Sequence, residues 1–381
     1  MFRPYIQRLE VLIVLALFSA GLFYWAATST VIVKARGYDL KISAAEKMTE
    51  AMTVLKEVRL GSEGVIMDDN PNDPNGTMLV GSGATPITTD RGNLDAKLTT
   101  LNPNFSAIIV DMLLAADVGK GDTIAMALTG SMPGANIAVL AACEVMDIYP
   151  VIITSVGASE WGATDPYFTW VDMESELVRG GVFKSSSIAA SVGGGGDSGK
   201  GLSRNGRDLL WEAIYRNNLQ LIQEKSLNSS IARRMTLFNE SLTLSNYKVY
   251  INVGGGAASV GPRINARLVP PGLTSAASLR GGLSDCVLKR FVDSDIPVIH
   301  IHNIDELTSK YDLPFSPIPT PNIGDGQIFS RHTFNQVNSF IALILSLGSL
   351  IIVGMKRLHC LVILGGAGYL LLLQPMNPLP I

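Results

Sequence analysis

Both ends of the chain contain apolar segments long enough to cross a membrane, and these segments restrict every later assignment. The first runs from Leu9 to Ala27 (LEVLIVLALFSAGLFYWAA), about the 20 residues that a transmembrane helix needs. Its last residues include Tyr24 and Trp25, aromatic side chains typical of a membrane interface. A cleaved signal peptide, the alternative, has a shorter apolar core and a small-residue exit. We therefore expect a cytoplasmic tail at residues 1–8 and an uncleaved anchor at residues 9–28.

The second apolar region lies at the C-terminal end and is interrupted once. Val337 to Val353 (VNSFIALILSLGSLIIV) and Leu358 to Leu373 (LHCLVILGGAGYLLLL) flank the short polar segment Gly354–Arg357. Each apolar run is close to the length of a membrane span. The pattern predicts a transmembrane hairpin with helices at residues 337–354 and 358–374.

Charges beside these segments predict the orientation of the chain. Basic residues concentrate on the cytoplasmic side of membrane proteins. The basic residues that flank the apolar segments are Arg3, Arg8, Lys356 and Arg357. If all four are cytoplasmic, residues 29–331 form a domain outside the cytoplasmic membrane. Lys34, Arg36 and Lys41 argue against this orientation, because they would lie on the outer side.

The composition of the chain excludes several functional classes. The formal net charge is −3 and no run of five like charges occurs, so we expect no nucleic-acid partner. The three cysteines are far apart and lack Cys-x-x-Cys spacing. We therefore expect neither a disulfide framework nor a zinc site, and no metal or other cofactor.

After Gly121 the sequence alternates short apolar segments typical of strands with segments typical of helices. The strand segments lack a clean polar face, which indicates a parallel sheet covered by helices on both faces. We predict one α/β domain with a mostly parallel, Rossmann-like sheet. The expected strands are Thr123–Leu128, Val151–Ser155, Ser187–Val192, Tyr247–Val253 and Pro297–His302. The expected helices are Ala44–Leu60, Ala135–Met146, Arg207–Ile222, Ser230–Phe238 and Ser284–Val292.

Loops rich in glycine and serine follow four of the predicted strands. They are Thr129–Gly134, Ser155–Gly162, Gly193–Gly201 and Gly254–Ser259. In parallel sheets, ligands bind at the carboxyl ends of strands, where glycine permits close approach and helix N-termini offer N–H groups to anions. Four such loops at one edge predict a single site. The alternative is that the glycines only turn the chain.

Candidate nucleophiles and metal ligands each have a structural alternative. Ser131 lies on a predicted strand-to-helix turn, but G-S-M-P-G differs from the G-x-S-x-G elbow of hydrolases. Side chains alternate between the two faces of a strand, so His300 and His302 lie on the same face and could form a metal pair. However, no His-x-x-x-His motif or suitably spaced carboxylate supplies a third metal ligand. We expect both histidines to be structural.

Nucleotide and sugar-phosphate sites are only weakly indicated. Gly194–Lys200 matches the start of a P-loop, but Gly201 replaces the serine or threonine that binds magnesium. Gly121–Gly157 is loosely similar to sugar-phosphate-binding isomerase domains. Carboxylates in or after the loops could transfer protons or orient a substrate, although helix capping, for which Asp172 or Glu174 is suited, is more common. They are Glu160, Asp172, Glu174 and Asp197.

Four segments taken together resemble the bacterial poly-γ-glutamate system protein family. They are ITTDRGNLDAKLTTLNPNFSAIIVDML, GDTIAMALTGSMPGANIAVLAACEVM, SVGASEWGATDPYFTWVDME and YINVGGGAASVG. The resemblance extends from about Thr77 to Gly326. It implies a pathway rather than a reaction, since members occur with the poly-γ-glutamate ligase, an ATP-using cytoplasmic enzyme, and its small membrane partner. We expect these two proteins, the polymer and the membrane as partners.

The matching positions supply the candidate site. The candidate catalytic residues are Ser131, Ser159 and Glu160. The candidate ligand-binding residues are Thr88, Thr89, Lys97, Gly130, Glu174, Gly195, Gly196, Asp197, Gly255, Gly256 and Ser259. Arginines near the loops could pair with γ-glutamyl carboxylates: Arg204, Arg207, Arg263 and Arg267.

Three functions remain open for this candidate site. The expected one is a membrane-anchored accessory protein of poly-γ-glutamate capsule or exopolymer biosynthesis that binds, exports or attaches the nascent polymer. The second is a γ-glutamyl amide hydrolase or transferase that uses Ser131 or Ser159 as its nucleophile. The third is a module that binds a small molecule or a sugar phosphate.

Overall fold

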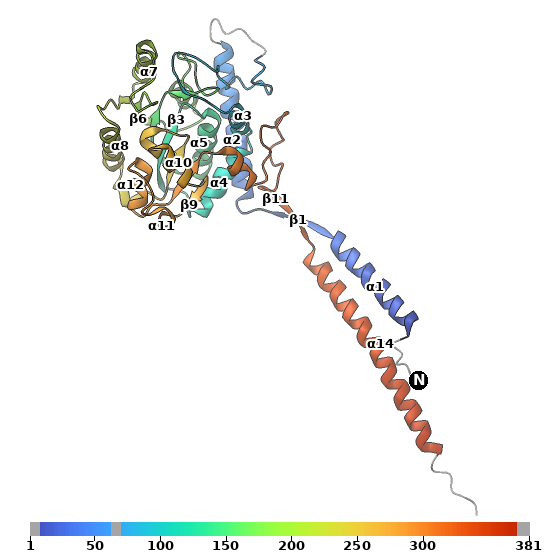
Figure 1. Ribbon diagram of the computed structural model, residues 1–381. Helices are drawn as coiled ribbons and strands as arrows, with labels where there is room; N and C mark the ends of the chain where they lie inside the picture. The colour runs from blue at the N-terminus through green and yellow to red at the C-terminus, as the bar shows by residue number, and fades with distance from the viewer. Residues whose placement is uncertain (1–7, 62–69, 372–381) are drawn as a thin grey trace, which may run out of the picture. The chain divides into compact units, whose positions relative to one another are not determined.

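The computed structural model describes residues 8–61 and 70–371, with side chains described up to residue 353 (Figure 1). The chain divides into two compact units. Residues 1–33 and 331–381 form the terminal unit, and residues 34–330 form the sheet unit.

The terminal unit contains two helices that pack along each other, α1 (Leu9–Thr28) and α14 (Gln336–Leu371) (Figure 1). A hydrogen bond joins them, because the hydroxyls of Ser19 and Ser346 lie 3.0 Å apart. The two-stranded sheet of β1 (Thr30–Lys34) and β11 (Ser330–Phe334) follows α1 and precedes α14. Leu9–Thr28 and Gln336–Val353 are both long and apolar enough to cross a membrane. The predicted anchor at residues 9–28 therefore coincides with a helix.

The C-terminal helix differs from the predicted hairpin. α14 continues through Gly354–Arg357, where we expected the turn between the two spans. Met355, Lys356 and Arg357 are good helix formers, and a single glycine weakens a helix without ending it. The first predicted span, residues 337–354, lies within α14. The second, residues 358–374, lies outside the residues whose side chains the structure describes.

A seven-stranded sheet forms the centre of the sheet unit. Every pairing in it is parallel except that of β9 with β10. The spatial order is β7 (Gln220–Leu221), β6 (Ser187–Ser191), β4 (Tyr149–Ser155), β3 (Thr123–Thr129), β8 (Tyr250–Val253), β10 (Val298–Ile301) and β9 (Gly272–Thr274). From β3 the chain adds strands toward β7 and then returns to add β8 and β10 on the other side. The predicted mostly parallel α/β sheet is confirmed.

Helices cover both faces of this sheet, because its central strands are apolar on both sides. In β3, Ile124, Met126 and Leu128 belong to one buried cluster, whereas Ala125 and Ala127 belong to another. The first cluster is completed by α2 (Tyr38–Gly61), α4 (Phe105–Ala115), α5 (Pro133–Met146), α6 (Trp170–Arg179) and α7 (Arg204–Arg216). The second is completed by α8 (Leu227–Ser241), α9 (Ala257–Val260), α11 (Ala276–Leu279) and α12 (Val287–Asp293).

Short elements outside these layers border the carboxyl edge of the sheet. β2 (Thr88–Asp90) pairs in parallel with β5 (Ala158–Ser159), and neither strand was predicted. The remaining helices are α3 (Leu94–Thr100), α10 (Arg263–Leu268) and α13 (Ile304–Ser309). The predicted helix at residues 207–222 is too long, since α7 ends at Arg216, Asn218 has a φ of 55°, and β7 follows.

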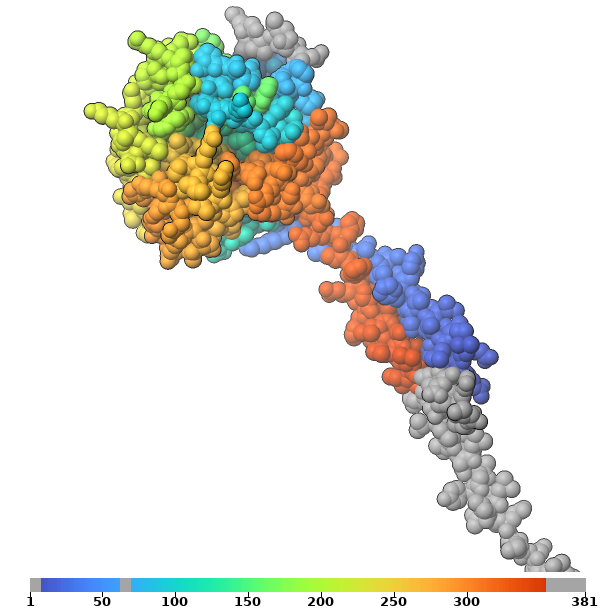
Figure 2. Space-filling model, viewed as in Figure 1, coloured from blue at the N-terminus to red at the C-terminus, as the bar shows by residue number. Residues whose placement is uncertain are grey.

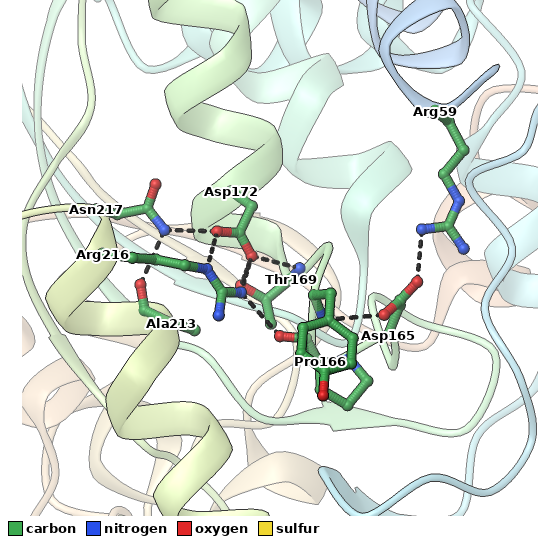
Figure 3. Close-up of polar contacts among 9 residues, drawn as sticks. Arg59, Asp165, Pro166, Thr169, Asp172, Ala213, Arg216 and Asn217 are labelled. Carbon is green, nitrogen blue, oxygen red and sulfur yellow. Dashed lines mark hydrogen bonds and ion pairs between the residues drawn. The ribbon is translucent and has the colours of Figure 1, made fainter. Parts of the chain in front are cut away.

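Polar contacts fix α6 against α7 (Figure 3). Asp172 accepts hydrogen bonds from the backbone N–H and hydroxyl of Thr169, which closes a capping box at the start of α6. Arg216 at the end of α7 donates from Nε to the same carboxylate at 2.7 Å. Asp172 is therefore a helix cap, the structural alternative considered for it. Arg59 on α2 makes a second ion pair, with Asp165, at 2.6 Å.

Candidate functional site

Each of the four glycine- and serine-rich loops contacts another of the four at the carboxyl edge of the sheet. The N–H of Gly130, after β3, donates to the carbonyl of Ser155 at the end of β4. The N–H of Gly157, after β4, donates to the carbonyl of Val192, after β6. The approach is too close for larger residues, since a Cβ on Gly130 would lie 2.2 Å from the Val156 oxygen. The fourth loop, after β8, lies against Thr129, whose hydroxyl donates to the carbonyl of Val253.

Lys97, Ser131 and Ser159 meet at this edge. Lys97 on α3 donates from Nζ to the Ser159 hydroxyl at 2.8 Å and to the Ser131 backbone carbonyl. The N–H of Ser159 in turn donates to the Ser131 hydroxyl at 3.0 Å. Ser159 lies on β5 and Ser131 on the loop between β3 and α5, so three separate segments build this cluster. Both serines are partly exposed, whereas Lys97 is only 4% exposed.

Burial changes the chemistry of Lys97. Desolvation lowers the pKa of its ammonium from 10.5 to about 7. Within the described part of the chain, no carboxylate lies at ion-pair distance from its Nζ. A lysine that is neutral near pH 7 can accept a proton from a hydroxyl in contact with it. This arrangement suits general-base activation of Ser159.

Thr89 and Glu160 lie next to this cluster. The Thr89 side chain packs against the positions where Gly157 and Gly194 would carry a Cβ, so it contacts the loops after β4 and β6. Glu160 accepts a hydrogen bond at 3.0 Å from the N–H of Gly92, which holds the loop between β2 and α3. Thr88 instead bonds through its hydroxyl to Thr85 at 3.2 Å.

Asp197 is enclosed by protein donors. It is 4% exposed and forms an ion pair with buried Arg234 at 3.0 Å. Its carboxylate also accepts hydrogen bonds from the hydroxyls of Ser155, Ser191 and Ser230. The network fixes the loop that contains Gly195 and Gly196 to β4, β6 and α8. The P-loop-like segment is therefore folded around an internal ion pair.

Glu174 and Ser259 also lie apart from the lysine cluster. Glu174 is 2% exposed and accepts from the N–H and hydroxyl of Ser187, the first residue of β6, at the end of that strand opposite the loops. Burial raises the pKa of Glu174 from 4.5 to about 7. Ser259 is buried on α9.

A cavity of about 890 Å³ opens beside the cluster, between α10, the loop after β8 and the end of β10. Among the candidate residues, Gly255 lines it, together with Arg263 and Arg267. Asp90 on β2 also lines it and is the register partner of Ser159 on β5. In Figure 2 the surface that includes α10 borders the surface that includes β2.

His300 and His302 lie at the inner wall of this cavity, as their common strand face predicts. Their rings stack with centroids 5.3 Å apart, and both side chains line the cavity. Burial lowers the pKa of His302, and the positive charge of Lys97 lowers it further. Among the described residues no group of three or more metal-ligating side chains includes them.

The described part of the chain is a mixed α/β protein with two helices long and apolar enough to cross a membrane. No family model, curated protein or solved structure matches it.

Sequence reasoning missed two features of the site. It treated Lys97 only as a ligand-binding position and did not foresee its burial against Ser159. It considered the two histidines as a base for Ser131, as metal ligands and, preferably, as structural residues, but not as part of a ligand cavity. Asp95 is the only other charged residue in LDAKLTT, and the mainly apolar and small neighbours of Lys97 are the one signal that could have suggested a buried lysine.

Proposed function

We propose that this protein is a membrane-anchored enzyme that cleaves or transfers γ-glutamyl amide bonds during poly-γ-glutamate biosynthesis, with Ser159 as nucleophile and Lys97 as base. The observation that carries the proposal is the 2.8 Å contact between the partly exposed hydroxyl of Ser159 and the buried Lys97, which has no carboxylate partner among the described residues. Serine and lysine form a known variant of the nucleophile and base pair. The polymer comes from the family resemblance.

The fold supports a site at this position. We infer a Rossmann-like sheet, because the chain builds outward from β3 in both directions. Ligands of such sheets bind outside the carboxyl ends of the strands, near the point where the strand order reverses. That point lies between β3 and β8, next to Ser131. α5 begins at Pro133, directly after the Ser131 loop, so the positive end of its dipole faces this edge.

The reaction follows from these positions. The Ser159 hydroxyl attacks the amide carbonyl carbon while its proton passes to the neutral Nζ of Lys97. The tetrahedral intermediate collapses as Lys97 returns the proton to the departing amine, which leaves an ester on Ser159. Water then completes hydrolysis, or an amine completes transfer. Ser131 is a positioning residue, since its carbonyl and hydroxyl hold Lys97 and the backbone of Ser159.

The test combines the purified full chain in detergent with poly-γ-glutamate of defined length. We expect the wild-type protein to shorten or transfer the polymer, and Ser159→Ala to lower the rate by about 10³-fold or more, as loss of a nucleophile does. Ser198→Ala removes an exposed hydroxyl from a neighbouring loop and is the matched control. Unchanged polymer length with the wild-type protein would overturn the enzymatic proposal.

A second candidate is the accessory role, in which the protein binds, exports or attaches nascent polymer beside the ligase and its membrane partner without breaking bonds. Arg263 and Arg267 in the cavity wall favour it, because guanidinium groups pair well with carboxylates. Polymer binding by the wild-type protein without any change in length would select this role. Both candidates place the sheet unit on the outer side of the cytoplasmic membrane.

A further inference from the structure

The cavity beside α10 contains a buried hydrogen-bond donor without a partner. His300 is 1% exposed, lines the cavity, and its Nε2 has no partner among the described residues. Its Nδ1 lies 3.0 Å from Nδ2 of Asn252. The same Nδ2 donates to the carbonyl of Gly254 at 2.7 Å, which fixes the orientation of the amide.

These contacts assign the tautomer of His300. An amide Nδ2 can only donate, so Nδ1 of His300 must accept and the ring proton resides on Nε2. A buried N–H without an acceptor is unfavourable, because it has lost its hydrogen bonds to water. Native structures pair most such groups, and a ligand atom that accepts this hydrogen bond would satisfy it.

The charges in the cavity wall favour an anion. Arg267 has no ion pair in the described part of the chain, whereas each acidic group of the wall already has a partner. Asp90 lies 3.8 Å from Arg263, and Glu306 lies 3.3 Å from Lys310. The remaining free charge in the wall is therefore positive.

An apolar side of the cavity limits the type of anion. Leu268, Val269 and Pro270 line it on the α10 side. The volume of about 890 Å³ is within the roughly 300–1,000 Å³ typical of small-molecule sites. A ligand that has an anionic group next to a short methylene segment matches both the polar and the apolar walls.

We propose that this cavity is a carboxylate-binding subsite, in which His300 donates from Nε2 to a carboxylate oxygen and Arg267 pairs with the same group. The ligand is an acidic peptide whose free carboxylates are attached directly to a backbone that contains short methylene segments, as in a γ-linked glutamate chain. Asp90 in the cavity wall is the register partner of Ser159, and neighbouring strands lie about 4.8 Å apart, so a bound peptide reaches the nucleophile. This last step rests on the proposed function, whereas the carboxylate subsite does not.

The test measures binding in a Ser159→Ala background, so that turnover cannot alter the probe. The probe is fluorescently labelled penta-γ-glutamate with free α-carboxylates, titrated with the full chain in detergent. Its α-carboxamide analogue is the neutral comparison. We expect the free acid to bind at least about 10-fold more tightly, since hydrogen bonds to charged groups are the stronger ones. Equal affinity for the two probes would overturn the subsite.

Variants connect the binding to the named residues. Arg267→Gln removes an exposed charge and should weaken binding of the free-acid probe about 10-fold. Arg280→Gln, outside the cavity, should leave the affinity for this probe unchanged. His300→Leu should also weaken binding, and His300→Gln, which retains a donor at similar reach, should restore most of it. If both His300 variants lose probe binding, the histidine has a structural role and is not part of the subsite.

Two further outcomes separate the alternatives. Inorganic phosphate that competes as well as the carboxylate probe would identify a phosphate site and overturn the carboxylate assignment. Tight carboxylate binding together with no polymer cleavage by the wild-type protein would support the subsite and contradict the Ser159 chemistry.

Discussion

At the scale of single residues, the site depends on a lysine in an environment that disfavours its charge. Lys97 is nearly fully buried and its contacts are a hydroxyl and a carbonyl. These groups hydrogen-bond to an ammonium without neutralising it. The fold therefore tolerates a group that lowers its stability, a common feature of catalytic sites.

We predict a pH-dependent stability effect of Lys97. The folded-state pKa is about 7 and the ordinary value 10.5, so between these pH values the unfolded chain binds a proton that the folded protein lacks. By linkage, the unfavourable contribution of Lys97 is complete below pH 7, shrinks as pH rises and vanishes above 10.5. Lys97→Met should thus stabilise the protein at pH 7 by a few kcal/mol, on the order of 1.4 kcal/mol per pKa unit.

Urea unfolding at pH 7 and pH 9.5 tests this effect. The difference in free energy of unfolding between Lys97→Met and wild type should narrow at the higher pH. Lys120→Met, at a lysine whose side chain is 82% exposed, should change stability little at either pH. A difference that stays constant between the two pH values would show that Lys97 keeps its ordinary pKa.

The sequence identified the members of this cluster without revealing their contact. Lys97, Ser131 and Ser159 were all candidates, but 34 and 62 residues separate Lys97 from the two serines. The contact between Lys97 and the two serines depends on how α3 packs beside the sheet edge. The hydrophobic periodicity of the sequence does not predict this packing. Asp197 shows the converse. Its glycine-rich surroundings suggested a ligand site, whereas its partner, Arg234, lies in a segment that was predicted as a helix with no site residue.

At the scale of elements, the Asp197 network joins two strands, a loop and a helix through one buried ion pair. Arg234 on α8 contacts the hydroxyls of Ser155 on β4 and Ser191 on β6 as well as the carboxylate. Both charged side chains are 1% exposed. Removing one partner of such a pair leaves the other as an uncompensated buried charge.

Arg234→Met should therefore lower the free energy of unfolding by about 3–5 kcal/mol. Arg233→Met is the matched control, because Arg233 is partly exposed and lies 3.7 Å from Glu240. An exposed pair contributes at most about 1 kcal/mol. Urea unfolding followed by tryptophan fluorescence compares the two variants. Similar stability of both would mean that the pair is solvated rather than buried.

Regular elements were predicted well where one face or both faces are continuously apolar. The strands β3 and β4 and the helix α5 match their predicted positions within two residues. β2, β5 and β7 were missed because two or three residues carry no periodicity. β9 was missed for the same reason, and its antiparallel direction is set by α10 and the proline-containing turn before it.

At the scale of the whole molecule, function depends on which side of the membrane the sheet unit occupies. Among the described residues, Leu9–Thr28 of α1 and Gln336–Val353 of α14 are each long and apolar enough to span a membrane. The segments that connect them to the sheet unit pair as β1 and β11. The end of α1 and the start of α14 are therefore on the same side. If the proposed function holds, a cytoplasmic location would give the site access to unfinished polymer, whereas an outer location would restrict it to exported chains.

We predict that the sheet unit is extracytoplasmic, because the positive-inside rule retains Arg8 in the cytoplasm. In a Cys360→Ser background the two remaining cysteines, Cys143 and Cys286, are buried, so only an introduced cysteine should react with the labelling reagent. In cells whose outer layers are permeable but whose cytoplasmic membrane is intact, a membrane-impermeant maleimide should label the cysteine of the Lys120→Cys variant. Arg8→Cys should react only after the membrane is permeabilised. The reverse pattern would place Ser159 in the cytoplasm and contradict the extracytoplasmic orientation.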